Sequence, residues 1–147
     1  MKTKILVVED MDLPLEALNI AIRLSVLREP KPIELSGDSQ RELEERGIDV
    51  VRTLEEARNY VEKSLYDLVL LDHNLPARVG SPAEDIGYTL IPKIKERNPE
   101  TYIVGTSSND RLPSYLVPDC AIRKSSMTLD EDIGNIYDKL ERRYEQK

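Results

Sequence analysis

The stretch ILVVED, residues 5–10, joins four branched apolar side chains directly to two acids. A short continuous apolar run of this kind is typical of a parallel strand that is buried on both faces. Residues 48–52 alternate in polarity, which predicts a strand at the edge of the sheet. Together with this edge strand, continuous apolar runs over 4–8, 67–71, 102–106 and 120–123 predict five strands in all.

Helical patterns lie between these runs. Asp12 is expected to cap a first helix, and Thr53 and Thr128 each stand three residues before a glutamate, which is the spacing of a capping box. A helical pattern over 86–99 contains Pro92, which lacks a backbone donor, so this helix is expected to begin late or to kink. The alternation of strands and helices predicts an α/β fold, with a parallel sheet covered by helices on both faces.

The composition restricts the class of protein. The chain has 147 residues and a net charge of -7, which makes nucleic acid a poor direct partner. It has no apolar run long enough to span a membrane, and its amino terminus lacks the pattern of a signal peptide. We therefore expect one domain over 1–147, in the cytoplasm. The single cysteine, Cys120, predicts no internal disulfide.

Polar residues follow the predicted strands at the points where the strands end. Glu9 and Asp10 follow the first strand, Asp72 the third, Ser107 the fourth and Lys124 the fifth. In an open parallel sheet, ligands bind outside the carboxyl ends of the strands, where the strand order changes direction. We therefore expect these five side chains to converge on one edge of the sheet, which we call the rim.

The chemistry of the rim favours a hard cation and a phosphoryl group. Three neighbouring carboxylates repel one another, which raises their pKa values unless positive charge lies among them. Oxygen ligands without thiols or a histidine cluster suit Mg²⁺, which retains waters and a position for a phosphate oxygen. Lys124 adds a movable positive charge, and the Ser107 hydroxyl can donate to an anionic oxygen. The rim therefore holds the parts of a phosphoryl-transfer site, with a carboxylate as nucleophile.

Four segments together resemble the receiver domain of two-component response regulators. They span the chain in the order of that family: VVED at 7–10, LLDHNLP at 70–76, IVGTSS at 103–108 and AIRK at 121–124. The resemblance implies a flavodoxin-like, doubly wound five-stranded parallel sheet of order 2-1-3-4-5. It also implies phosphorylation on aspartate by a sensor histidine kinase or a phosphotransfer protein.

The resemblance further implies a role for each rim residue. These roles are the phosphoacceptor Asp72, the magnesium-binding acids Glu9 and Asp10, the switch hydroxyl Ser107 and the family's lysine Lys124. The backbone carbonyl of Asn74 is implied as a further ligand of the metal, beside the carboxylates. Thr106 stays open as a substitute for Ser107.

The chain departs from the family in five places. Ser125 stands where a cis proline is usual, and Ala121 stands where many receivers carry a rotating Tyr or Phe. Residues 28–46 and 77–85 lengthen two connections, and the proline-bearing segment 108–119 predicts a short or irregular helix. We expect 28–46 to be a solvated, partly helical excursion, with a family-specific docking surface as the alternative.

These features predict a single-domain response regulator rather than an enzyme, with output through an unidentified protein partner or onward phosphoryl transfer. A phosphorylation-independent interaction module is the alternative. A Mg²⁺-dependent phosphatase is disfavoured, because Asn74 stands where a second acid is needed. His73, the only histidine, is predicted to be an exposed loop residue rather than a catalytic base, since neighbouring side chains at a strand end point to opposite sides.

Overall fold

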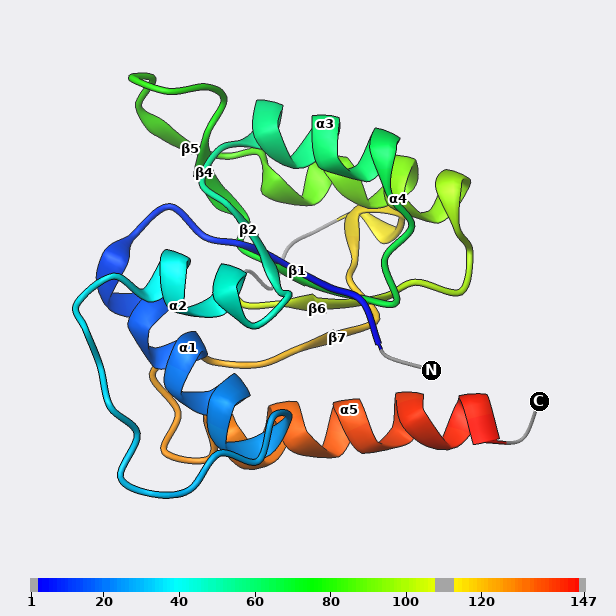
Figure 1. Ribbon diagram of the computed structural model, residues 1–147. Helices are drawn as coiled ribbons and strands as arrows, with labels where there is room; N and C mark the ends of the chain where they lie inside the picture. Colours follow the sequence, from blue (N-terminus) through cyan, green and yellow to red (C-terminus); the bar gives the residue numbers. More distant parts are fainter. Residues whose placement is uncertain (1–2, 108–112, 146–147) are drawn as a thin grey trace.

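A five-stranded parallel sheet forms the centre of the protein, of which the computed structural model describes residues 3–107 and 113–145 (Figure 1). Its strands, in their order across the sheet, are β2 (Asp49–Val51), β1 (Ile5–Val8), β3 (Leu68–Leu71), β6 (Tyr102–Gly105) and β7 (Cys120–Ala121). This is the predicted order 2-1-3-4-5, and β2 lies at an edge as its alternating polarity predicts. The predicted α/β fold class is therefore confirmed.

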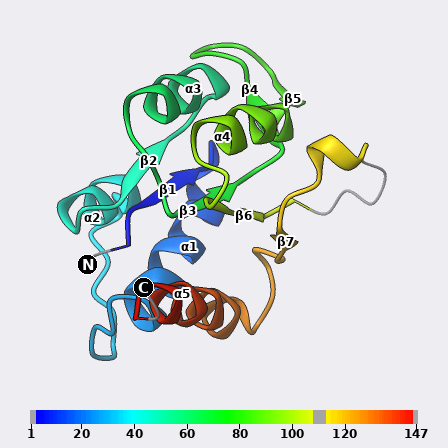
Figure 2. The same ribbon diagram turned by 90° about the vertical axis from the view of Figure 1, so that its right-hand side faces the viewer.

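Helices cover both faces of the sheet (Figures 1 and 2). One face carries α1 (Asp12–Ser25) and α5 (Leu129–Glu145), and the other carries α3 (Leu54–Lys63) and α4 (Ile91–Arg97). The short α2 (Ser39–Glu45) packs against α1 and β2. Within the described residues, none of these helices combines the length and the hydropathy that a membrane span requires.

Alternate residues of the central strands enter two separate cores. Ile5 and Val7 of β1 pack with α1 and α5, whereas Leu6 and Val8 pack with α3 and α4. All four side chains are almost completely buried, and each such burial contributes about 1.5–3 kcal/mol. Coverage of both faces explains why the strands appear in the sequence as continuous apolar runs rather than as alternating ones.

Predicted start signals coincide with three of the helices. The Thr53 hydroxyl accepts a hydrogen bond from the Glu56 backbone N–H at 3.1 Å, which caps α3. Thr128 directly precedes α5. Pro92 stands in the first turn of α4, after the 3-10 helix η1 (Gly87–Leu90), so the predicted late start is confirmed. A proline is tolerated there because the first turn needs no backbone donor.

The connection 28–46 is anchored to the core by buried charges. Its helix α2 confirms the prediction of a partly helical excursion. The Arg23 guanidinium of α1 lies 2.5 Å from the Glu42 carboxylate and 2.9 Å from that of Glu29, and the Arg23 and Glu42 side chains are both buried. The prediction of a solvated excursion agrees with residues 30–38, which are mostly exposed, whereas Glu29 and Glu42 pair with Arg23 and so bind the two ends of the segment to α1.

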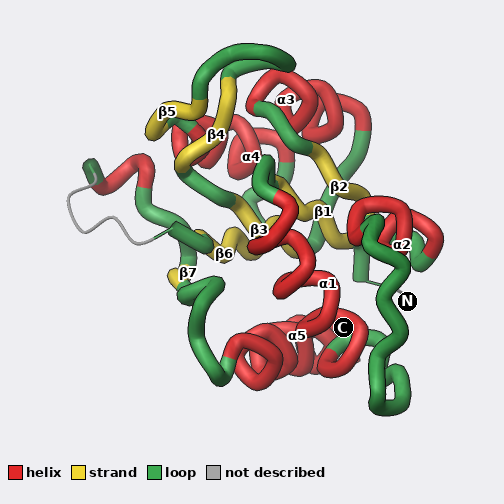
Figure 3. Tube along the Cα trace, turned by 90° about the vertical axis from the view of Figure 1, so that its left-hand side faces the viewer, coloured by secondary structure: helices red, strands yellow, loops and turns green. Residues whose placement is uncertain are grey.

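The two other unusual connections differ in structure. Residues 77–85, expected as a long loop, form part of a hairpin of two antiparallel strands, β4 (Asn74–Pro76) and β5 (Ala83–Asp85). Figure 3 looks onto the carboxyl edge of the sheet and shows this hairpin beside the ends of the strands. Residues 113–119 contain the 3-10 helix η2 (Ser114–Leu116), which agrees with the predicted short helix. Residues 108–112 lie outside the described part of the chain.

Candidate functional site

Backbone hydrogen bonds fix the polar residues that follow the central strands. The N–H groups of Glu9, Asp72 and Thr106 donate to carbonyls of the neighbouring strands at 3.1, 3.1 and 3.0 Å. Each of these residues is the first beyond its strand. The hydrogen bonds of the parallel sheet therefore continue one residue past the strands. They hold the backbones of Glu9, Asp72 and Thr106 side by side at the rim.

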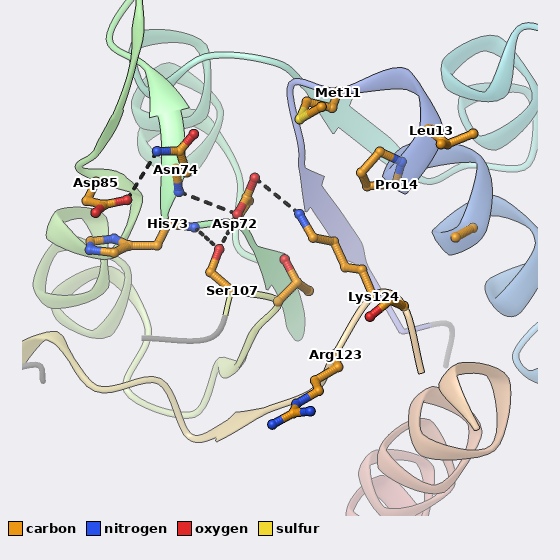
Figure 4. A pocket seen from close by; sticks show the side chains of 13 residues that line it. Met11, Leu13, Pro14, Asp72, His73, Asn74, Asp85, Ser107, Arg123 and Lys124 are labelled. Carbon is orange, nitrogen blue, oxygen red and sulfur yellow. Dashed lines mark hydrogen bonds and ion pairs between the residues drawn. The ribbon is translucent and has the colours of Figure 1, made fainter. Parts of the chain in front are cut away.

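The rim brings three carboxylates and one lysine together. Oxygen atoms of Glu9, Asp10 and Asp72 lie within 4.8 Å of one another. Lys124 Nζ lies 2.6 Å from Glu9 Oε1 and 3.3 Å from Asp72 Oδ2, and Figure 4 shows it pointing toward Asp72. The Glu9 side chain has no exposed surface, and Asp72 is 4% exposed. The predicted convergence of these residues is confirmed.

Burial makes Glu9 and Asp10 hard to ionise. It raises the pKa of Glu9 to about 7, although the hydrogen bond from Lys124 opposes the shift. Burial also raises the pKa of Asp10, and the charge of Asp72 acts in the same direction. Asp10 Oδ1 is buried and has no hydrogen-bond partner in the described residues. A cation placed among these oxygens would oppose both effects, because it favours the ionised form of each carboxylate.

The two candidate switch hydroxyls occupy different positions. The Ser107 hydroxyl donates to Asp72 Oδ1 and accepts a hydrogen bond from the His73 backbone N–H at 2.9 Å (Figure 4). Thr106 Oγ1 is buried and lacks a partner among the described residues. Ser107 is therefore the hydroxyl that contacts the central aspartate, as expected. The Asn74 N–H also reaches Asp72 Oδ1, at 3.4 Å, which places Asn74 beside the carboxylates.

His73 is buried, so its predicted exposure is wrong. It is 4% exposed and its ring stacks on Tyr88, with 4.3 Å between the ring centroids. Burial lowers the pKa of His73, and its Nδ1 accepts a hydrogen bond from the Tyr88 N–H at 2.9 Å. The ring points away from the Asp72 carboxylate (Figure 4). The stacking accounts for the burial, and the orientation agrees with the expectation that His73 is not a catalytic base.

Arg52, which the sequence analysis does not single out, positions the loop after β1. Its guanidinium donates to the Asp10 carbonyl at 3.1 Å and forms an ion pair with Asp12. The prediction that Asp12 caps α1 is wrong, because Met11 is the cap residue and Asp12 begins the helix. The Asp12 carboxylate instead pairs with Arg52, and this ion pair joins the start of α1 to the end of β2. An arginine directly after an edge strand carries no pattern that could have predicted this contact.

Two departures from the family pattern are compatible with the rim geometry. The peptide bond between Lys124 and Ser125 is trans, yet Lys124 reaches both Glu9 and Asp72. Ala121 is exposed on β7 and offers no ring to the rim. An open cleft of about 830 Å³ lies beside Asp72, between the start of α1, the hairpin and the segment after β7.

Searches against protein-family models and against curated proteins find no match. Solved structures match nearly the whole chain. The response regulator TrrA of Thermotoga maritima, in complex with Mg²⁺ and BeF, is 23% identical with a TM-score of 0.59, over 95% of this chain and 99% of that one. The receiver domain of a Pseudomonas aeruginosa sensor histidine kinase, with Mg²⁺ in its active-site cleft, is 16% identical with a TM-score of 0.63, over 95% and 98%. The chain has the fold of a response regulator receiver domain.

A further solved structure matches this chain over the full length of both. The N-terminal domain of an uncharacterised protein from Wolinella succinogenes is 16% identical with a TM-score of 0.64, and the match covers 100% of both chains. The resemblance inferred from four short segments is thus confirmed for the fold. At these identities the likeness carries no residue roles, so the roles of the rim residues rest on their own geometry.

Proposed function

We propose that this chain is a response regulator that accepts a phosphoryl group on Asp72 and signals through a protein partner or a phosphorelay. The donor is the phosphohistidine of a sensor histidine kinase or a phosphotransfer protein. The observation that best supports this is the position of Asp72 on the rim of a receiver fold, in contact with Lys124 and Ser107. In this proposal the chain is a phosphoryl acceptor and not an enzyme acting on a substrate.

The contacts of Asp72 suit it to act as the nucleophile. One carboxylate oxygen attacks phosphorus, the P–N bond of the phosphohistidine breaks, and the imidazole leaves with the electron pair. Lys124 Nζ, 3.3 Å from Asp72 Oδ2, is near enough to neutralise an oxygen of the transferred group. The Ser107 hydroxyl, on the side of Oδ1, can donate to another. Positive charge and a donor thus flank the acceptor from the ends of two different strands.

Mg²⁺ fits the acidic side of the rim. Glu9, Asp10 and Asp72 offer only carboxylate oxygens, which suits a hard cation, and Asp10 Oδ1 is buried without a partner. Asn74 is close enough to Asp72 for its carbonyl to join them. When bound, Mg²⁺ supplies positive charge to the oxygens of the phosphoryl group. The TrrA and Pseudomonas structures hold Mg²⁺, which supports this choice of metal.

Intact-mass analysis tests the proposal directly. After incubation with acetyl phosphate and Mg²⁺, the chain is expected to gain one phosphoryl group that is stable in acid and labile in base. The gain requires Mg²⁺ and disappears in the Asp72→Asn variant. Because Asp85 lies next to the same cleft, Asp85→Asn is the matched control and should retain the label. No phosphoryl gain in the wild-type chain would contradict the proposed function.

One observation favours the phosphorylation-independent module as a second candidate. Ala121 provides no aromatic ring on β7 that could report the state of the rim to the exterior. In that case the chain would bind its partner equally with and without phosphorylation. A pull-down from a lysate, in which the phosphorylated and the Asp72→Asn chains are compared, separates the two candidates. A partner retained by only one of these forms supports the response regulator.

A further inference from the structure

The hydroxyl of Tyr88 is bonded to both backbone polar groups of Ser107. It accepts a hydrogen bond from the Ser107 N–H at 3.3 Å and donates to the Ser107 carbonyl at 3.2 Å. Tyr88 is 1% exposed and belongs to the core beneath α3 and α4. Tyr88 belongs to η1 and Ser107 follows β6, so the contact joins two segments that are distant in the sequence.

We propose that Tyr88 is a positioning residue for the switch. Its hydroxyl holds the backbone of Ser107 so that the serine hydroxyl faces Asp72, and its ring transmits a movement of Ser107 to the β4–β5 hairpin. The second half of this inference rests on the proposed function, because it concerns the response to a phosphoryl group. The first half concerns the protein without any ligand and stands on the contacts alone.

The backbone near Tyr88 makes room for its hydroxyl. Gly105 is the last residue of β6, and a Cβ atom at this position would collide with the Tyr88 hydroxyl and with the Pro118 ring. Gly87, the residue before the tyrosine, passes so close to the Asp72 carbonyl that a Cβ atom there would overlap it. Both glycines therefore permit an approach that any other residue would block. The Tyr88 ring is consequently buried between His73, on which it stacks, and Gly105, which its hydroxyl approaches.

His73 connects Tyr88 to both ends of the hairpin. Its ring stacks on the tyrosine ring and its Nδ1 accepts the Tyr88 N–H. His73 directly precedes β4, and its carbonyl accepts hydrogen bonds from Ile86 at 3.0 Å and Gly87 at 2.7 Å, immediately after β5. A displacement of the tyrosine ring therefore reaches the two strands of the hairpin through one stacked pair and its hydrogen bonds.

A phosphoryl group on Asp72 would change the contacts of Tyr88 and His73 through the Ser107 hydroxyl. In the unliganded protein the Ser107 hydroxyl donates to Asp72 Oδ1 and accepts from the His73 N–H. When Asp72 carries a phosphoryl group, the serine hydroxyl finds its acceptor farther out, among the phosphoryl oxygens. A movement of the Ser107 backbone toward those oxygens would act on Tyr88, which is bonded to that backbone at both polar groups. Tyr88 thus offers an aromatic route from the rim that does not involve Ala121 on β7.

The Tyr88→Phe variant tests the inference, because it removes the hydroxyl and keeps the ring. Tyr66→Phe is the matched control: Tyr66 is equally buried and its hydroxyl bonds Asp49 at 2.6 Å, but it precedes β3 at the opposite end of the strand. In the unliganded protein, NMR amide exchange at Ser107 should be roughly tenfold faster in Tyr88→Phe, and unchanged in Tyr66→Phe. Unchanged exchange at Ser107 in Tyr88→Phe would overturn the inference.

Beryllofluoride with Mg²⁺ tests the coupling to the hairpin. Wild type and Tyr66→Phe should show altered amide exchange over 74–87 when beryllofluoride binds, and Tyr88→Phe should bind it, as detected by fluorine NMR, with little change there. An equal response of 74–87 in Tyr88→Phe and wild type would refute the coupling. If the wild-type chain does not bind beryllofluoride, the proposed function fails, whereas the exchange at Ser107 without ligand still decides the role of the tyrosine hydroxyl.

Discussion

Lys124 Nζ lies 2.6 Å from Oε1 of Glu9, a carboxylate with no exposed surface. The lysine side chain is 19% exposed, so it reaches inward from the cleft to an acid that water cannot reach. Its distance to Asp72 is longer, at 3.3 Å. In the unliganded protein the lysine therefore serves mainly to neutralise Glu9. If a metal ion takes over that task, the lysine is free to turn toward a phosphoryl group on Asp72.

Replacement of Lys124 should destabilise the protein in a pH-dependent way. Lys124→Met leaves Glu9 without its cation, which should lower the free energy of unfolding at pH 8 by about 3 kcal/mol. The pKa of Glu9 is about 7 with the lysine present and rises further without it. At pH 5 Glu9 is protonated in both proteins, so the loss should be much smaller. Urea unfolding at the two pH values measures this difference.

Lys93→Met is the control for that experiment. Lys93 pairs with Glu62 on the surface, where both side chains are partly exposed. Its replacement should show no loss that grows between pH 5 and pH 8. Equal destabilisation of Lys124→Met at both pH values would contradict the assignment of Glu9 as the buried partner.

Magnesium affinity should rise with pH and then level off. Metal and proton compete for the same carboxylates, and Glu9 releases its proton only near pH 7 because burial raises its pKa to about 7. Below that pH the apparent affinity should fall by up to about tenfold per pH unit. Calorimetric titration with Mg²⁺ between pH 5.5 and pH 8.5 would measure it. Glu9→Gln should flatten this dependence, and an affinity independent of pH in the wild type would argue against Glu9 as part of the metal site.

Asp72→Asn should abolish labelling by acetyl phosphate without unfolding the protein. The amide keeps the shape of the carboxylate but is not a nucleophile. Its neutrality also removes repulsion with Glu9 and Asp10, so the melting temperature without metal should be unchanged or higher. Calorimetry and intact mass test the two parts separately. A clearly lower melting temperature would show that the contacts of Asp72 to Lys124 and Ser107 outweigh the repulsion.

The two hydroxyls after β6 should differ in their effect on phosphorylation. Ser107→Ala removes the group that contacts Asp72, and it should slow the reaction with acetyl phosphate by about tenfold or more. Thr106→Ala removes a hydroxyl that has no partner in the described residues, and the rate should change little. Intact-mass spectra recorded at successive reaction times would compare the phosphorylation rates of the two variants. The reverse order of rates would identify Thr106 as the switch hydroxyl.

The ion pairs of Arg23 with Glu29 and Glu42 should be important for stability. Glu42→Gln leaves the buried Arg23 with only Glu29 as an acidic partner, and should lower the free energy of unfolding by about 3 kcal/mol. Glu45→Gln is the control, because Glu45 pairs with Arg41 on the exposed side of the same helix. It should leave the stability nearly unchanged. Equal values for the two variants in denaturant unfolding would show that the buried pair of Arg23 and Glu42 does not stabilise the fold.

The sheet and the rim could be predicted from local sequence. A strand that is buried on both faces must be apolar at every position, so runs such as ILVV at 5–8 are recognisable without any tertiary contact. In a parallel sheet all strands end at the same edge, so the polar residue after each strand is placed by chain direction alone. Those two rules locate Glu9, Asp72 and Lys124 together, as the structure confirms.

Only the tertiary structure determined which side chains surround and support the rim. Tyr88 belongs to a helical pattern and His73 to a loop, and neither position indicates that the two rings stack or that the tyrosine hydroxyl reaches Ser107. The hairpin of β4 and β5 and the pairing of Arg23 with Glu42 are likewise absent from any local pattern. Such contacts depend on the distances at which whole elements pack. A charged side chain such as that of Arg23 is stable away from water because this packing brings Glu42 within reach of it.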